Sequence, residues 1–224
     1  MKHPLQQARF AYTVANDAQL PPPGPPEVAF AGRSNAGKSS AINTLANQTR
    51  LAFTSKTPGR TQQINFFELR NGTLLADLPG YGYAAVPQEL KRHWQEFLAR
   101  YLATRQSLVG LVLVVDARHG LADLDVTLLE GYLPSSRPVL VLATKMDKLA
   151  PSAQRTAARD LARDLAARFP EHAGRMHVIG FSATRRLGVA EAEALLGSWL
   201  GLGDEPVAAH AGAPEKKRPR DQGE

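Results

Sequence analysis

Apolar residues follow two different spacings along this chain, and each spacing predicts a different kind of element. Short apolar runs predict buried strands, and longer stretches with an apolar residue every third or fourth position predict amphipathic helices. The strands are expected at 27–31, 63–69, 73–77, 109–115, 138–143 and 176–181, and the helices at 38–46, 88–106, 122–132, 152–169 and 189–200.

The order of these elements predicts an α/β fold with three layers. Strands that alternate with helices favour a mostly parallel sheet with right-handed crossovers and helices on both faces. Asn71-Gly72 lies between two predicted strands and is typical of a tight antiparallel hairpin. We therefore expect one antiparallel hairpin at the edge of the sheet.

The two ends of the chain differ from its centre. The proline-rich segment 21–26 bounds an N-terminal extension, 1–20, in which Phe10, Tyr12 and Val14 can form an edge strand. From residue 201 onward the chain is rich in Gly, Pro, Ala and charge, which predicts a disordered tail over 201–224. A single domain over 21–200 remains.

Composition narrows the setting. The 224 residues include no cysteine, which excludes disulfides, thiolate metal sites and cysteine nucleophiles. The longest apolar run is too short to span a bilayer, and the N-terminus lacks a signal-peptide core, so we expect a cytoplasmic protein without membrane contact. The net charge of +6 favours a polyanionic partner, and the tail does not supply it, because it holds four basic and five acidic residues.

The segment Gly32-Arg33-Ser34-Asn35-Ala36-Gly37-Lys38-Ser39 carries the clearest chemistry. It satisfies Gly-x4-Gly-Lys-Ser directly after a predicted strand and before a predicted helix. Glycines let successive N–H groups turn toward a phosphate, Lys38 reaches the outer phosphates, and the Ser39 hydroxyl reaches Mg²⁺. The pattern predicts a nucleoside triphosphate as ligand.

Two further segments close predicted strands, at the sheet edge where ligands bind in such folds. Asp77-Leu78-Pro79-Gly80 can hold Mg²⁺ through a water at Asp77 and offer the Gly80 N–H to a γ-phosphate. In Thr144-Lys145-Met146-Asp147, the Asp147 carboxylate can accept two hydrogen bonds from guanine but not from adenine. A third strand end, Phe181-Ser182-Ala183, can place a backbone N–H against the guanine O6, so GTP is the expected nucleotide.

These ordered motifs, with 56–62 (Lys-Thr-Pro-Gly-Arg-Thr-Gln) between the first two, resemble the translation-factor-related class of P-loop GTPases. Within that class they resemble the bacterial EngB-type (YihA/YsxC) ribosome-biogenesis GTP-binding proteins over about residues 9–200. The resemblance implies a Ras-like fold and a cytoplasmic, monomeric GTPase that acts in assembly of the large ribosomal subunit, through rRNA and ribosomal proteins. It also implies a role in normal cell division and septation.

The resemblance also assigns roles to residues. Ser39 and Thr61 would bind Mg²⁺ directly, Asp77 would bind it through water, and Lys38, Thr61, Gly80 and Asn35 would act in hydrolysis. The residues expected to contact GTP or GDP are Gly32, Arg33, Ser34, Asn35, Ala36, Gly37, Lys38, Ser39, Ser40, Gly59, Arg60, Thr61, Gln62, Gln63, Asp77, Leu78, Pro79, Gly80, Thr144, Lys145, Met146, Asp147, Phe181, Ser182 and Ala183.

Three positions depart from the common GTPase pattern or extend it. Thr144 replaces the usual asparagine, which predicts a weaker bond to the base or to the phosphate loop. Tyr81 stands where small GTPases place a water-orienting glutamine, which predicts slow intrinsic hydrolysis. Asn35 can help to bind K⁺ beside the phosphates, as in similar GTPases, or can simply suit a tight turn.

Other interpretations stay open. Arg155, Arg159 and Arg163 recur on one helix face, which suits either solvent or an RNA phosphate backbone. A P-loop ATPase or kinase would share the phosphate loop but would not use Asp147. A nucleotide-gated scaffold would share every motif, with turnover incidental.

Overall fold

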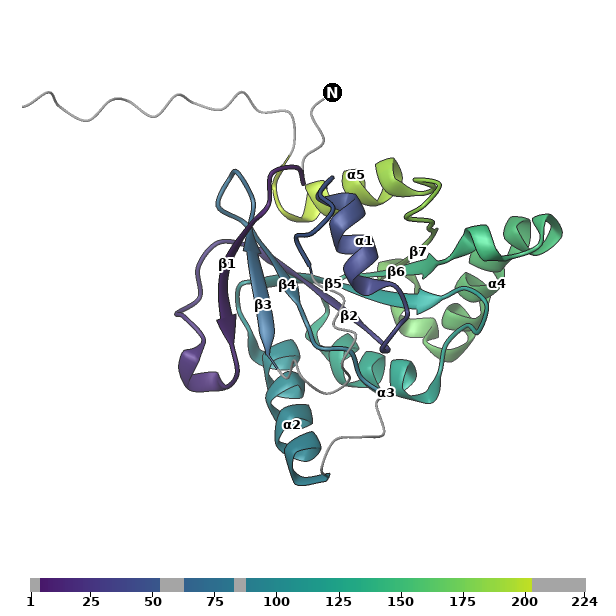
Figure 1. The fold of residues 1–224 in the computed structure, drawn as a ribbon. Coiled ribbons are helices and arrows are strands. Elements are labelled where there is room, and N and C mark those ends of the chain that lie inside the picture. The colour runs from purple at the N-terminus through teal and green to yellow at the C-terminus, as the bar shows by residue number, and fades with distance from the viewer. Residues whose placement is uncertain (1–4, 53–62, 83–87, 203–224) are drawn as a thin grey trace, which may run out of the picture.

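The computed structural model describes residues 5–52, 63–82 and 88–202 and contains one seven-stranded sheet (Figure 1). Across the sheet the strands follow the order β1-β3-β4-β2-β5-β6-β7. Their bounds are β1 Arg9–Val14, β2 Glu27–Gly32, β3 Ile64–Glu68, β4 Leu74–Asp77, β5 Leu108–Asp116, β6 Val139–Thr144 and β7 Met176–Gly180. Each predicted strand is present, with its ends shifted by a residue or two.

Within the described residues, β3 is the one strand that runs against the others. It pairs antiparallel with β1 on one side and with β4 on the other, whereas β4, β2, β5, β6 and β7 pair in parallel. The mostly parallel α/β fold is therefore confirmed. The β3–β4 hairpin does not itself form the edge of the sheet, because β1 pairs with β3 outside it.

Helices cover both faces of the sheet, as Figure 1 shows. Their bounds are α1 Lys38–Leu45, α2 Gln88–Thr104, α3 Asp123–Tyr132, α4 Pro151–Arg168 and α5 Val189–Trp199, with short 3₁₀ turns η1 Asp17–Gln19, η2 Leu133–Ser135, η3 Met146–Lys148 and η4 Pro170–Arg175. Buried residues of α1 and α5 join one apolar cluster, and those of α2, α3 and α4 join the other.

Strand β2 shows why both faces need covering. Val28 and Phe30 belong to the cluster under α1 and α5, whereas Ala29 and Ala31 belong to the cluster under the other helices. All six residues of β2 are buried. A strand that is apolar on both sides is stable only between two layers of helices, which fixes β2 near the centre of the sheet.

Some sequence predictions fall outside the described residues. These are residues 53–62, which include Thr61, and the tail from 203 onward. On α2, Phe97 and Tyr101 are buried as the helical spacing predicts, and the side chains of Leu90 and Trp94 lie outside the described set. No helix in the described parts is both long enough and apolar enough to cross a bilayer.

A buried ion pair fixes the amino end of β2. The Arg105 Nε donates to Glu27 Oε1 at 2.6 Å, and the Arg105 Nη1 donates to the carbonyl of Pro21 at 2.7 Å. The Tyr101 hydroxyl donates to the same Glu27 oxygen at 3.3 Å, and Glu27 is fully buried. This network joins the proline-rich entry segment and α2 to the central strand.

Replacing Arg105 with Met should destabilise the fold by about 3–5 kcal/mol, because it leaves a buried carboxylate without its cationic partner. Urea denaturation measures this change in the free energy of unfolding. The matched control is Arg100→Met in α2, the helix that Arg105 directly follows, where a 56% exposed side chain lies 3.4 Å from Asp17. That control should change stability by less than about 1 kcal/mol, and an equal cost for both variants would contradict the prediction.

The cost should also depend on pH. Burial raises the pKa of Glu27 although hydrogen bonds from Arg105 and Tyr101 oppose the rise. A carboxyl with a raised folded pKa stabilises the fold at low pH and loses that contribution as pH rises through the folded value. Without Arg105 the folded pKa rises further, so Arg105→Met should cost less near pH 4.5, the usual value for glutamate, than near neutral pH.

Candidate nucleotide-binding site

The carboxyl ends of the parallel strands bring the predicted site segments to one edge of the sheet. Strand β2 leads into the phosphate loop, β4 ends at Asp77, and β6 ends at Thr144. Phe181 follows β7, and Asp116 ends β5. Segments that are far apart in the sequence therefore meet at one edge, as the strand-end rule predicts.

The phosphate loop, defined here as Gly32 to Ser39, ends at the start of α1. Gly37 has a φ of 104°, in the left-handed region that favours glycine, and directly precedes the first helical residue, Lys38. The Lys38 ammonium contacts the Asp77 carboxylate, and both side chains are largely buried. The cationic and anionic groups expected at phosphate and metal therefore converge in front of a helix N-terminus, where anions bind well.

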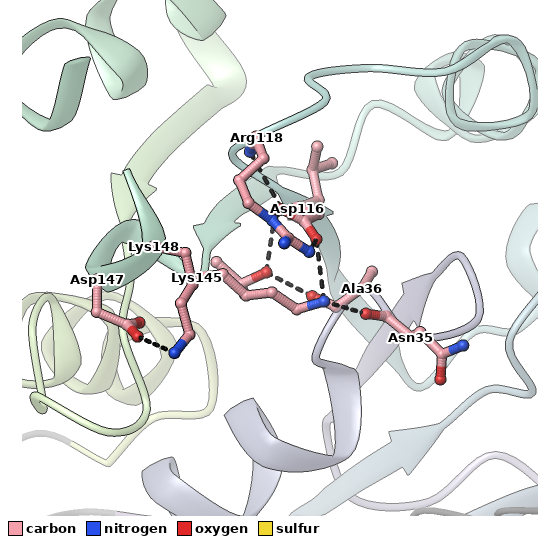
Figure 2. A network of polar contacts seen from close by, with 9 residues as sticks. Asn35, Ala36, Asp116, Arg118, Lys145, Asp147 and Lys148 are labelled. Carbon is pink, nitrogen blue, oxygen red and sulfur yellow. Dashed lines mark hydrogen bonds and ion pairs between the residues drawn. The ribbon is translucent and has the colours of Figure 1, made fainter. Parts of the chain in front are cut away.

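Backbone carbonyls of the phosphate loop are bound by residues of the β6 end (Figure 2). The Thr144 hydroxyl lies within hydrogen-bonding reach of the Ala36 carbonyl and also of the Val115 carbonyl, at 3.1 Å. The Lys145 ammonium donates to the Asn35 carbonyl at 2.5 Å. In a planar trans peptide the Gly37 N–H points opposite to the Ala36 carbonyl, and so away from Thr144.

Thr144 contacts the phosphate loop through its hydroxyl. That this bond is weaker than one from asparagine stays a prediction. Thr144 is 4% exposed, and a side chain at Gly37 would lie 3.4 Å from its Oγ1. Thr144 therefore fills the space behind the loop as well as binding it.

Sequence analysis missed Asp116 and Arg118, which complete this network (Figure 2). Lys145 Nζ lies 2.9 Å from Asp116 Oδ2, and Arg118 binds the same carboxylate through Nε at 2.9 Å and Nη2 at 2.7 Å. Burial favours the protonated acid, but the hydrogen bonds from Arg118 and Lys145 prevail and hold the pKa of Asp116 well below its usual range. The position of Asp116 at a strand end was the signal that could have identified it.

The segment after β4 is hydrogen-bonded to the phosphate loop. The Ser34 N–H donates to the Tyr81 carbonyl at 2.9 Å, and the Tyr81 N–H donates to the Gly32 carbonyl at 3.4 Å. Gly80, next to Tyr81, also lies close to the loop: a Cβ added at Gly80 would be 3.0 Å from Ser34 Oγ and 3.2 Å from Ser34 Cα. Glycine at position 80 permits this close approach.

The Tyr81 side chain is used in a way that the sequence did not predict. Its hydroxyl donates to Asp125 Oδ1 at 2.6 Å, at the start of α3. Burial and the neighbouring Asp125 carboxylate raise the pKa of Tyr81, so the phenol stays protonated and remains a donor. The hydroxyl is thus engaged by α3.

At the other end of the site, Asp147 is oriented by Ser182. The Ser182 hydroxyl donates to Asp147 Oδ1 at 2.7 Å, and this bond holds the pKa of Asp147 below its usual range. Ser182 is itself fixed by two backbone hydrogen bonds with Leu187, at 3.2 and 3.1 Å. The Met146 N–H donates to the Phe181 carbonyl at 3.2 Å, which joins the two segments expected around the base.

A pocket of about 230 Å³ opens beside the phosphate loop. Its lining combines the loop with the end of β5, the first turn of α3 and Lys145, and consists of Arg33, Ser34, Asn35, Ala36, Val114, Val115, Asp116, Arg118, His119, Gly120, Asp125 and Lys145. The pocket therefore lies at the sheet edge at which the nucleotide is expected.

The described residues could bind Mg²⁺ together with phosphate oxygens and waters, but not by themselves. Asp77 and Ser39 supply hard oxygen atoms next to Lys38, and in residues 5–52, 63–82 and 88–202 no three acidic or histidine side chains are placed together so that they could hold a metal ion. Mg²⁺ commonly uses one or two protein oxygens with phosphates and waters, which fits this arrangement. Bound there, the ion would neutralise charge on the phosphates.

Other predicted residues have mixed outcomes. Gly59, Arg60, Thr61 and Gln62 lie outside the described residues, and Gln63 is exposed just before β3. Asn35 is exposed with a φ of 66°, a left-handed conformation that asparagine tolerates well, so the turn interpretation has a structural basis.

The arginine face of α4, formed by Arg155, Arg159 and Arg163, has an acidic partner at only one of these three residues within the described part of the chain. Arg163 lies 3.5 Å from Asp160, and the expected helical pair of Asp164 and Arg168 is present at 2.8 Å. Arg155 and Arg159 are exposed.

Comparison with known proteins identifies the family. Residues 27–145 match the family model described as 50S ribosome-binding GTPase. The probable GTP-binding protein EngB of Azoarcus sp. (strain BH72) is 49% identical over 210 residues, which cover 94% of this chain and 97% of that protein. The probable EngB of Neisseria meningitidis serogroup B is 46% identical over 214 residues, covering 95% and 98%.

Solved structures support the same fold. The crystal structure of a probable GTP-binding protein EngB aligns with a TM-score of 0.60 at 20% identity, covering 79% of this chain and 99% of that one. Era in complex with MgGDPNP and nucleotides 1506–1542 of 16S ribosomal RNA aligns with a TM-score of 0.61 at 21% identity, covering 83% and 60%. The chain belongs to the EngB family of GTP-binding proteins and is a P-loop GTPase.

Proposed function

We propose that this GTPase binds GTP and GDP with Mg²⁺ at the sheet edge and acts as a switch in assembly of the large ribosomal subunit. The observation that carries the nucleotide assignment is the pairing of Asp147 with Ser182 beside a phosphate loop whose carbonyls are held by Thr144 and Lys145. One end of the site thus offers a carboxylate suited to guanine, and the other offers N–H groups and Lys38 for phosphates.

In this proposal each segment acts on a different part of the nucleotide. Lys38 neutralises the β- and γ-phosphates, the Gly80 N–H meets the γ-phosphate, and Ser39, Thr61 and Asp77 hold Mg²⁺ directly or through water. Hydrolysis is slow without a partner, because Tyr81 occupies the position of the water-orienting glutamine and its hydroxyl binds Asp125.

The ribosomal role rests on the family. Residues 27–145 match a model described as 50S ribosome-binding GTPase, and the net charge of +6 suits a polyanionic partner. We extend the proposal to a cytoplasmic monomer, with residues 21–200 as the GTPase domain, that is needed for normal cell division and septation. A nucleotide-gated scaffold with incidental turnover is the alternative.

Replacing Asp147 with Asn tests the base site. The amide can donate to the xanthine O2 and accept from N1–H, so the preference should move from GTP to xanthosine triphosphate, with GTP affinity lowered about 100-fold. Equilibrium titration with both nucleotides measures the change. Ser182→Ala is the matched control, since it should weaken GTP binding without creating xanthine preference; an unchanged preference in Asp147→Asn would sink the assignment.

A cation dependence would support a role for Asn35 in hydrolysis. The Asn35 carbonyl binds Lys145, whereas its side-chain amide points away from that contact (Figure 2). If the amide helps to bind K⁺ beside the phosphates, hydrolysis should be faster in K⁺ than in Na⁺, and Asn35→Ala should remove the difference. Equal rates in both salts, with and without ribosomal subunits, would leave Asn35 as a turn residue.

Sedimentation with ribosomal subunits tests the switch. The protein should comigrate with the large subunit or its precursor more strongly in GTP than in GDP or without nucleotide. A hydrolysis rate that the subunit does not raise would favour the scaffold over the GTPase switch. Comigration that ignores the nucleotide would refute both.

A further inference from the structure

We propose that Tyr81 and Asp125 couple the γ-phosphate segment to the first turn of α3. Tyr81 is a positioning residue in this proposal. It holds Gly80 at the phosphate loop, and when Gly80 moves, the Tyr81 hydroxyl changes its bond to Asp125 in α3. The proposal rests on the proposed function, because it takes the Gly80 N–H as the group that meets the γ-phosphate.

The first link joins Tyr81 to the phosphate loop. Its main chain is hydrogen-bonded to Ser34 and Gly32 through its carbonyl and its N–H, at 2.9 and 3.4 Å. Gly80 lies so close to Ser34 that an added Cβ would be 3.2 Å from Ser34 Cα. A shift of Gly80 toward or away from a phosphate must therefore move Tyr81.

The second link joins Tyr81 to α3 through one carboxylate. Asp125 Oδ1 accepts from the Tyr81 hydroxyl at 2.6 Å, and Asp125 Oδ2 accepts from the Ala122 N–H at 2.9 Å. Asp125 is 1% exposed, so both bonds are shielded from water. Because Ala122 N–H is the group that the carboxylate caps at the start of α3, the same side chain holds Tyr81 and the helix end.

The coupling reaches the surface within the same turn. Leu124, next to Asp125, is 39% exposed, and a side chain at Gly82 would lie 3.7 Å from its Cδ1. Displacement of Tyr81 would therefore change the first turn of α3 at a point that solvent can reach. The structure of the first turn of α3 should therefore differ between the GTP-bound and GDP-bound states.

The test compares wild type with Tyr81→Phe, which removes the hydroxyl and keeps the ring. Binding of GDP and of a non-hydrolysable GTP analogue, each with Mg²⁺, is measured by titration. Loss of one hydrogen bond to a carboxylate should weaken the analogue about tenfold relative to GDP, since only the analogue carries a γ-phosphate. A merely structural role for Tyr81 would weaken both nucleotides equally and would overturn the proposal.

Hydrogen exchange supplies a second readout. In wild type the amides of residues 122–126 should exchange more slowly with the GTP analogue than with GDP, and Tyr81→Phe should abolish that difference. Asp125→Asn should have a similar effect, because an amide oxygen cannot replace both carboxylate acceptors. The double variant should then be no worse than Asp125→Asn alone, because Tyr81→Phe removes an interaction that Asp125→Asn has already weakened.

Asp123→Asn is the matched control. It removes the same charge from the same turn of α3. Asp123, however, is exposed and lies two positions before Asp125 in the sequence. It should leave the ratio of analogue to GDP affinity unchanged. Wild type that binds both nucleotides but shows no difference in α3 exchange refutes the coupling alone, whereas wild type that binds neither refutes the proposed function.

Discussion

The site depends on one constraint: the phosphate loop must turn its carbonyls away from the side that receives an anion. Each peptide of the loop carries one donor and one acceptor, and a buried acceptor without a partner is costly. Here Thr144, at the end of β6, contacts the buried Ala36 carbonyl, and the next residue, Lys145, adds a more exposed bond to the Asn35 carbonyl. Because these two residues adjoin Asp147, the segment proposed to choose the base also fixes the shape of the phosphate loop.

Acidic side chains at this edge are partnered one by one. Asp116 binds Lys145 and Arg118, Asp77 contacts Lys38, and Asp125 binds Tyr81. The cationic partners lower the repulsion that Asp116 and Asp77 would otherwise exert on a phosphate, and all of these bonds give their loops a defined position. The edge is therefore built from separate polar contacts, each of which joins two segments.

The amino end of the central strand, β2, carries a different kind of contact. There Glu27 and Arg105 form a buried pair that joins β2 to α2 and to the proline-rich entry segment. This pair lies at the amino end of a parallel strand, opposite the edge at which ligands bind in such folds, so we expect its loss to act mainly on stability.

The sequence by itself determined the strands, the helices, the parallel sheet and the positions of the phosphate and base motifs, because apolar spacing and glycine placement are local signals. It did not reveal that Asp116 binds Lys145, 29 residues on, or that Asp125 binds Tyr81, 44 residues back. Tyr81 could be recognised as an unusual residue, but only tertiary structure decided that its hydroxyl turns to α3. Which side chains meet over such sequence distances depends on the order in which the strands pair in the sheet, and a local sequence pattern does not encode that order.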